Sequence, residues 1–149
     1  MTDWVKASVT AAKTAKWSIT MTRWLIARLK VKTAWNLVTF VGPQGRESAG
    51  IVDILAVRKN HAPADSGLKR GDVFEIILIQ VKGGSARWPS WDDINRLRIV
   101  SRRYRAKATL LAEWKKGAQP RLYRLRRVAR IGNPPTAWVK IEAPGALFD

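Results

Sequence analysis

Long apolar runs alternate along this chain with short polar segments, and two of these runs have the composition of buried β-strands. Residues 51–57 are almost wholly apolar and β-branched, and residues 73–82 stay apolar until their end. Residues 35–41 and 108–114 have a similar character, and we expect residues 35–41 to form a hairpin with residues 51–57. Residues 122–128 predict a further strand, whose basic residues are typical of a sheet edge.

Two other segments have the spacing of amphipathic helices. Residues 2–32 contain almost no acidic residues, glycine or proline, which predicts one or two helices. The simpler interpretation is a helix that covers one face of the sheet. A basic amphipathic N-terminus is also compatible with an organelle-targeting or membrane-surface helix. Residues 91–105 follow Ser90, which has Asp93 three positions later and so resembles a capping box. The apolar stripe of this helix comprises Ile94, Leu97, Val100 and Tyr104.

These elements predict an α/β protein with a mixed central sheet of about four to five strands flanked by helices. A chain of 149 residues is long enough for one domain with its own core and short for two. We therefore expect a single domain, with a helical segment at 1–32, a core at 33–114, and a basic strand and tail at 115–149. The tail carries no recognisable chemistry and is expected to run extended along the body.

The first apolar strand contains one carboxylate, Asp53, and the next ends with Gln80 and Lys82 two residues apart. Alternation along a strand places Gln80 and Lys82 on the same face. A charge buried in a strand costs several kcal/mol unless it is paired or bound to a metal. We therefore expect Asp53, Gln80 and Lys82 to converge.

This pattern resembles the active-site signature of the PD-(D/E)XK nuclease superfamily. In that signature an Asp lies on one strand, and the next strand ends with an acid or amide followed, two residues later, by Lys. The order strand, strand, helix, strand is similar to that of archaeal Holliday-junction resolvases and their restriction-endonuclease-like relatives. The resemblance covers residues 33–114 and departs from the family at three points. Gln80 stands where most members have an acid, residues 58–71 form an inserted loop, and the first helix has no glutamate to help hold a metal.

The resemblance implies metal-dependent hydrolysis of nucleic-acid phosphodiesters, by a DNA endonuclease of the structure-selective or resolvase type that acts as a homodimer. Asp53, Gln80 and Lys82 would be catalytic. Mg²⁺ takes oxygen ligands, so Asp53, the Gln80 side-chain oxygen and the Val81 carbonyl form a ligand set for Mg²⁺ or Mn²⁺, and Lys82 would orient or deprotonate the attacking water. A single carboxylate predicts lower metal affinity than two.

Charge also favours a nucleic-acid partner, with DNA preferred to RNA. The formal net charge is +17, and residues 87–130 hold 14 basic against 3 acidic residues, so most of the positive field lies in the C-terminal half. Arg46 in the hairpin connection is a candidate phosphate contact or a solvated turn residue. The candidate nucleic-acid contacts are Arg46, Arg87, Arg96, Arg98, Arg102, Arg103 and Arg105.

Two alternatives remain open for these residues. Asp53 and Lys82 could form a buried ion pair with Gln80 satisfying the remaining hydrogen bonds, in a domain that binds DNA or RNA without cleaving it. Trp88 and Trp91 could stack on unpaired bases, although packing against the helix is the simpler expectation.

Composition excludes several other classes of site. The absence of cysteine excludes disulfides and thiolate metal sites, and one histidine cannot build a zinc site alone. The sequence contains no run of 18 apolar residues, so it predicts no membrane span. We expect a cytoplasmic protein associated with nucleic acid.

Overall fold

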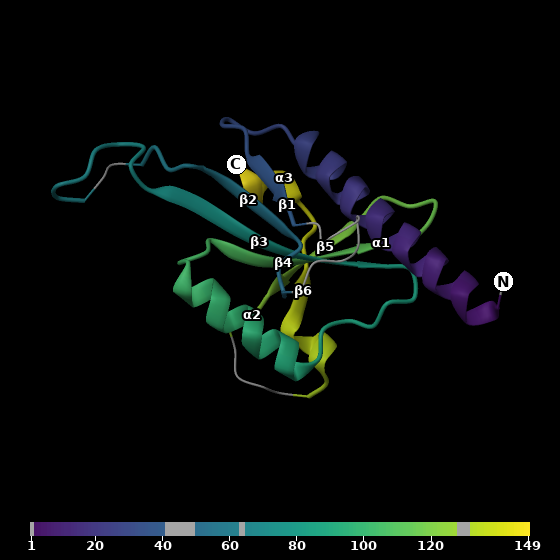
Figure 1. The fold of residues 1–149 in the computed structure, drawn as a ribbon. Coiled ribbons are helices and arrows are strands. Elements are labelled where there is room, and N and C mark those ends of the chain that lie inside the picture. Colours follow the sequence, from purple (N-terminus) through teal and green to yellow (C-terminus); the bar gives the residue numbers. More distant parts are fainter. Residues whose placement is uncertain (1, 41–49, 63–64, 128–131) are drawn as a thin grey trace.

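The computed structural model describes residues 2–40, 50–62, 65–127 and 132–149, and it places a six-stranded mixed sheet between helices (Figure 1). The prediction of an α/β fold with flanking helices is confirmed, with one strand more than the upper expected number. The elements are α1 (Asp3–Ala27), β1 (Asn36–Thr39), β2 (Ile54–Lys59), β3 (Phe74–Gly83), α2 (Trp91–Arg103), β4 (Ala108–Trp114), β5 (Arg121–Leu125), the short 3₁₀ helix η2 (Pro134–Ala137), β6 (Trp138–Lys140) and α3 (Pro144–Phe148).

The six strands lie in the sheet in the order in which they occur along the chain. β1, β2 and β3 form an antiparallel meander, and β4, β5 and β6 form a second one. The two meanders join through parallel pairing of β3 with β4, for which α2 supplies the crossover. The order strand, strand, helix, strand expected from the sequence is therefore present as β2, β3, α2 and β4.

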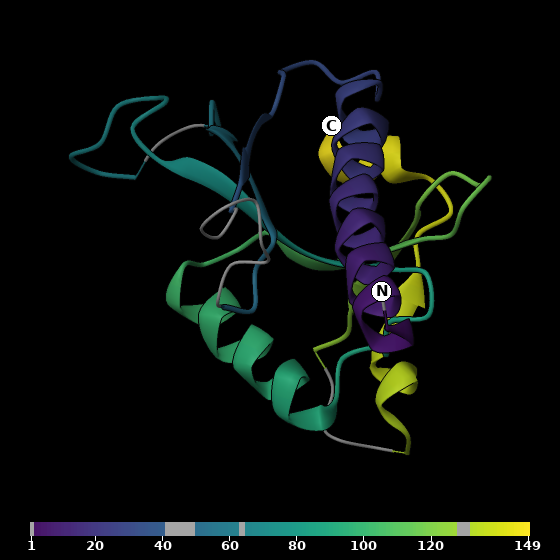
Figure 2. The same ribbon diagram turned by 45° about the vertical axis from the view of Figure 1, so that its right-hand side comes forward.

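Each face of the sheet has its own apolar core, and the two long helices cover opposite faces (Figure 2). On the α1 side, Ile26 packs with Ile54, Ile79 and Leu110. On the α2 side, the core comprises Ile94, Leu97, Leu111, Leu125, Ala137 and Trp138. Residues that alternate along β3 and β4 therefore point in turn to α1 and to α2.

The N-terminal segment is a single helix, α1, and it covers one face of the sheet as expected. Its inner face carries Ser18, Thr22 and Ile26, which are all buried. At the end of β3 the contact is close, because a Cβ added to Gly83 would lie 2.5 Å from the Ser18 Oγ. No helix within the described residues is long and apolar enough to cross a membrane.

The second helix begins as predicted, with a complete capping box between Ser90 and Asp93. Ile94 and Leu97 are fully buried, but Tyr104 is 57% exposed and does not continue the apolar stripe. The helix ends at Arg103 rather than Arg105, because Arg105 adopts a left-handed backbone conformation with φ of 50°.

Several predicted strand limits need correction. The first motif strand, expected at 51–57, is β2 at Ile54–Lys59, so Arg58 lies within the sheet rather than in an inserted loop. Arg58 is tolerated in the strand because Glu75 on β3 pairs with it at 2.7 Å. The hairpin of β1 with β2 is confirmed, and its connection at 41–49 lies outside the described residues.

The further strand predicted in the C-terminal region is present, but its edge position and the extended tail were wrong. The strand expected at 122–128 is β5 at Arg121–Leu125, and it is not an edge strand, because β6 pairs beyond it. The tail is not extended, since it forms η2, β6 and α3. Phe148 of α3 is fully buried against the α1-side core and packs edge-on against Trp35. The tail therefore completes both the sheet and its packing.

Candidate functional site

Asp53 lies one residue before β2, at the point where this strand leaves regular pairing with β3. Its backbone N–H still donates to the Ile79 carbonyl at 3.0 Å. Its side chain then takes over from the ladder, because the Val81 N–H donates to the Asp53 Oδ2 at 2.7 Å. The carboxylate is thus held against the backbone of Val81, the middle residue of the segment Gln80, Val81 and Lys82.

Gln80 and Lys82 lie on the face of β3 that carries α2. In the parallel register, Gln80 is opposite Leu111 of the α2-side core and Lys82 is opposite Glu113. Gln80 is only 6% exposed, and its Oε1 has no hydrogen-bond partner among the residues that the structure describes. An unsatisfied buried carbonyl oxygen costs free energy, so this atom is a candidate ligand for a cation or a donor that approaches from outside the chain.

Glu113 on β4 is a second carboxylate that the sequence-based prediction missed. It is paired in register with Lys82 and is half-buried. The Trp88 indole N–H donates to the Glu113 Oε2 at 2.7 Å, and the Trp88 ring packs edge-on against Tyr123 with centroids 4.7 Å apart. The parallel pairing of β3 with β4 places Glu113 beside Lys82, and this register could not be read from the sequence. The sequence did offer one indication, because Glu113 is the one acidic residue in the predicted strand 108–114.

The residues at this end of β3 fit a hard cation better than a soft one. Asp53 offers a carboxylate, Gln80 an unbonded amide oxygen and Val81 a backbone carbonyl, and these are the donors that Mg²⁺ accepts. Across the described residues, no cluster of three or more His, Cys, Asp or Glu side chains could hold a metal ion. The protein would therefore contribute few charged ligands, and water and phosphate would complete the coordination.

Three of the arginines predicted to contact nucleic acid line one cavity, and the others are exposed or lie outside the described residues. Arg46 lies outside the described residues. Arg87 is exposed ahead of α2, and Arg96 is exposed and lies 3.7 Å from the Asp93 carboxylate. Arg103 is exposed at the end of α2. The remaining three, Arg98, Arg102 and Arg105, line one cavity together with basic residues of other elements.

Trp88 and Trp91 are half-buried against the α2-side core. The Trp88 indole N–H also donates a hydrogen bond to Glu113. The expectation that these rings pack is confirmed, and base stacking is the less suitable role for them.

Comparison with known proteins identifies a resemblance of fold only. No protein-family model matches this sequence, and no curated protein matches it. Among solved structures, the chain is similar to Hjc, a Holliday junction resolvase from the archaeal hyperthermophile Archaeoglobus fulgidus. The two sequences are 15% identical, the match covers 90% of this chain and 88% of that chain, and the TM-score is 0.46.

Proposed function

We propose that this protein hydrolyses phosphodiester bonds of nucleic acid, DNA in preference to RNA, with a divalent metal ion held at the end of β3. The observation that carries the proposal is the position of Asp53. Its carboxylate is bonded to the Val81 N–H, and the residues on either side of Val81 are Gln80, whose buried Oε1 has no partner among the described residues, and Lys82. A carboxylate held at this strand end, next in sequence to an amide and a lysine, supports binding of a cation beside a polyanion.

Phosphodiester hydrolysis requires an activated water and relief of negative charge on the phosphoryl oxygens. Asp53, Gln80 Oε1 and the Val81 carbonyl would hold Mg²⁺ or Mn²⁺, and the ion would supply that charge relief. Lys82 would orient the attacking water or accept its proton. The bond from Val81 N–H fixes one Asp53 oxygen, so that the carboxylate is positioned before substrate arrives.

A second candidate is binding without cleavage, and the amide at position 80 favours it. Gln80 brings an oxygen but no charge, and one oxygen of the other nearby carboxylate, Glu113, already accepts from Trp88. Both nearby carboxylates already accept a hydrogen bond within the chain, and a site with so little uncompensated negative charge binds Mg²⁺ weakly. The net charge of +17 would support nucleic-acid binding in either case.

The test is incubation of purified protein with branched, duplex and single-stranded DNA in Mg²⁺ or Mn²⁺, with EDTA as the control. We expect metal-dependent cleavage that Asp53→Asn and Lys82→Ala abolish. Asn can still accept from Val81 N–H through its amide oxygen, so Asp53→Asn should fold. Asp65→Asn and Lys116→Ala change the same charges at exposed positions and should leave cleavage unaltered.

Melting curves beside the cleavage assays separate the alternatives. If the parent protein shows no cleavage and either Asp53→Asn or Lys82→Ala unfolds it, the buried ion pair is the better account of these residues. If the parent binds DNA in EDTA with a steep salt dependence but never cleaves it, the binding protein is the correct assignment. A log–log salt slope of magnitude above about 4 would correspond to five or more phosphate contacts.

The resemblance also implied a homodimer, which gel filtration with light scattering would test. A four-way junction presents two symmetric strands, so a resolvase needs two copies of its site. A monomer that cleaves only unbranched DNA would exclude the resolvase type while leaving the hydrolysis proposal intact.

A further inference from the structure

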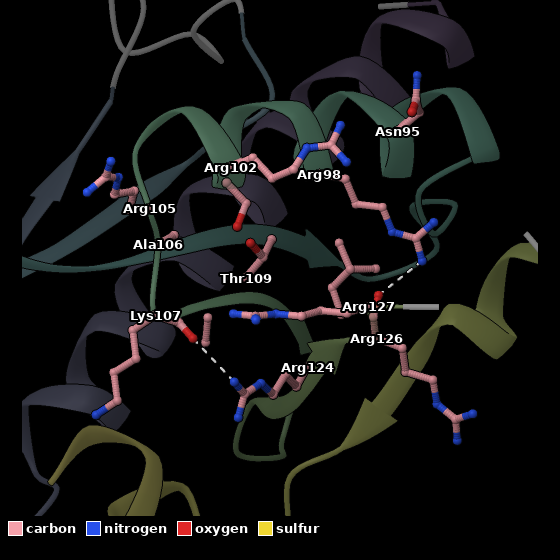
Figure 3. Close-up of a pocket in the computed structure, with 13 residues that line it drawn as sticks. Asn95, Arg98, Arg102, Arg105, Ala106, Lys107, Thr109, Arg124, Arg126 and Arg127 are labelled. Carbon is pink, nitrogen blue, oxygen red and sulfur yellow. Dashed lines mark hydrogen bonds between the residues drawn. The ribbon is translucent and has the colours of Figure 1, made fainter. Parts of the chain in front are cut away.

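A cavity of about 540 Å³ opens between the C-terminal half of α2, the start of β4 and the end of β5. Figure 3 shows basic side chains from all three elements around it. Its basic lining residues are Arg98, Arg102, Arg105, Lys107, Arg124, Arg126 and Arg127. The Lys107 ammonium lies 3.9 Å from a Glu75 carboxylate oxygen, so the six arginines are the residues that favour an anion. The remaining lining residues, all among those the structure describes, include no aspartate or glutamate.

Part of this basic lining is fixed in place by backbone carbonyls rather than by acids. Arg98 reaches from α2 to donate to the Arg126 carbonyl at 3.0 Å, and Arg124 donates to the Lys107 carbonyl at 3.2 Å (Figure 3). These bonds hold like charges together across three elements. Such an arrangement repels itself unless an anion enters it.

Two buried donors in the cavity wall have no partner within the described part of the chain. Thr109 is 4% exposed, and its Oγ1 makes no hydrogen bond to any described residue. The Arg98 Nε is also unbonded, although another nitrogen of the same guanidinium is used. Buried donors without partners are rare in folded proteins, and here both line the same basic cavity.

We propose that this cavity binds a phosphate group of a nucleic-acid strand, with Thr109 and Arg98 as donors and the surrounding arginines as countercharges. The identity of the ligand rests on the proposed function, but the cavity does not include the candidate catalytic residues. A volume of about 540 Å³ is within the range that holds small ligands and accommodates a phosphate with its attached sugar. Arginine is well suited to this ligand because its planar donors match phosphate oxygens.

The cavity would bind a phosphate of the substrate strand at a distance from the candidate cleavage site. Thr109 is opposite Leu78 in the parallel register, and Glu113 is opposite Lys82. Four residues along a strand correspond to ~13 Å at ~3.3 Å per residue. One strand held at both points would be fixed in register with respect to Lys82, which is the role of phosphate contacts.

The test measures the affinity for a fluorescent DNA oligonucleotide in EDTA, so that cleavage plays no part. We expect Arg127→Ala and Thr109→Val each to weaken binding on the order of 10-fold. Arg127→Ala should also lower the magnitude of the log–log salt slope by about 1. The matched control is Arg23→Ala, which removes the same charge from an exposed position on α1 and should change affinity less than about twofold.

Thr109→Val keeps the side-chain shape and removes an unbonded hydroxyl, so its melting temperature should not fall. Weaker binding by this variant without a lower melting temperature supports the phosphate site. Binding by both cavity variants equal to that of Arg23→Ala overturns it, whether or not the protein cleaves DNA. Failure of cleavage alone, with these losses of binding intact, would reject the proposed function and not the cavity.

Competition identifies the source of the phosphate. A nucleic-acid site predicts that inorganic phosphate and a nucleoside monophosphate displace the oligonucleotide only at concentrations far above that of the oligonucleotide itself. A nucleoside monophosphate that binds the parent as tightly as the oligonucleotide, and binds Arg127→Ala weakly, would reassign the cavity to a free nucleotide and overturn the strand assignment.

Discussion

Among the buried polar side chains of the two faces, Arg58 on the α1 side differs most from Gln80 and Thr109 on the α2 side. On the α1 side, Arg58 is 7% exposed and its guanidinium is satisfied by Glu75 and by the carbonyls of Thr33, Phe148 and Asp149. It also stacks over Trp35 at 4.2 Å. On the α2 side, Gln80 and Thr109 are equally buried, and the Gln80 Oε1 and Thr109 Oγ1 have no partner in residues 2–40, 50–62, 65–127 and 132–149.

This difference separates a structural role from a candidate ligand site. The described residues include six buried polar or charged side chains, and four of them, Ser18, Thr22, Asp53 and Arg58, have hydrogen bonds within the chain. Gln80 and Thr109 are the other two, and both belong to the face that also carries Lys82. Satisfied groups stabilise the fold, whereas unsatisfied ones cost stability unless a ligand completes them.

The largest expected effect is the loss of the Arg58 network. Arg58→Met should lower the free energy of unfolding by ~3–5 kcal/mol, because Glu75 and several carbonyls would lose their donor in a buried site. Urea denaturation measures this change. Gln80→Met is the matched control, since it removes a polar group with no Oε1 partner and should cost far less. Equal losses for the two variants would show that the faces do not differ.

A smaller loss should follow from crowding the α1 face. Gly83→Ala would place its Cβ 2.5 Å from Ser18 Oγ and 2.9 Å from Ser18 Cβ, so α1 would have to shift. We expect a cost of ~1–3 kcal/mol, as for overpacking elsewhere. Gly145→Ala is the control, because nothing lies within 4 Å of a Cβ there. Thermal melts that show no difference between the two variants would contradict a close α1 contact.

Much of this fold could be predicted from local pattern. The apolar runs predicted β4 with its observed limits and β3 with an error of one residue at each end, and the capping box at Ser90 located the start of α2. β6 was missed because a strand of three residues that follows a pair of prolines is too short to show a recognisable alternation of apolar and polar positions. Arg58 was excluded from its strand because the sequence does not reveal that Glu75 is its partner.

The candidate site was predictable only in part, for a similar reason. Alternation along one strand placed Gln80 and Lys82 together, and the cost of a buried charge singled out Asp53. Glu113 required the parallel register, and the basic cavity required α2, β4 and β5 to meet. Such convergence is a property of tertiary structure, so Lys107 and Arg124 have no signal in the sequence beyond their charge.

The substitution Gln80→Glu distinguishes a structural role of position 80 from a metal-binding role. If Asp53 and Gln80 hold a cation, the added charge should tighten metal binding and lower the Mg²⁺ concentration for half-maximal cleavage. Stabilisation by Mg²⁺ should reach ~1.4 kcal/mol at about ten times the dissociation constant. If the residues are purely structural, an extra carboxylate beside Asp53 should destabilise the fold with or without metal.

Melting curves of Gln80→Glu with and without Mg²⁺ distinguish these outcomes. Gln119→Glu makes the same chemical change in an exposed turn and controls for non-specific effects of charge and metal. Unchanged stability of Gln80→Glu in both conditions would count against a metal at position 80.

The smallest expected effect concerns Arg105, which lines the basic cavity with a φ of 50°. A left-handed conformation is unfavourable for a residue with a Cβ, so Arg105→Gly should relieve strain, although glycine also gains entropy in the unfolded chain. The net result should be a gain of ~0.5–1 kcal/mol in the free energy of unfolding, measured by urea denaturation. The same variant should bind DNA more weakly and with a shallower salt slope, because one cation is lost. Arg103→Gly, at an exposed helical position nearby, should instead lose stability, since glycine is a poor helix former. A gain in stability with unchanged DNA affinity would mean that Arg105 ends the helix without contributing to binding, and the cavity would then depend on its other basic residues.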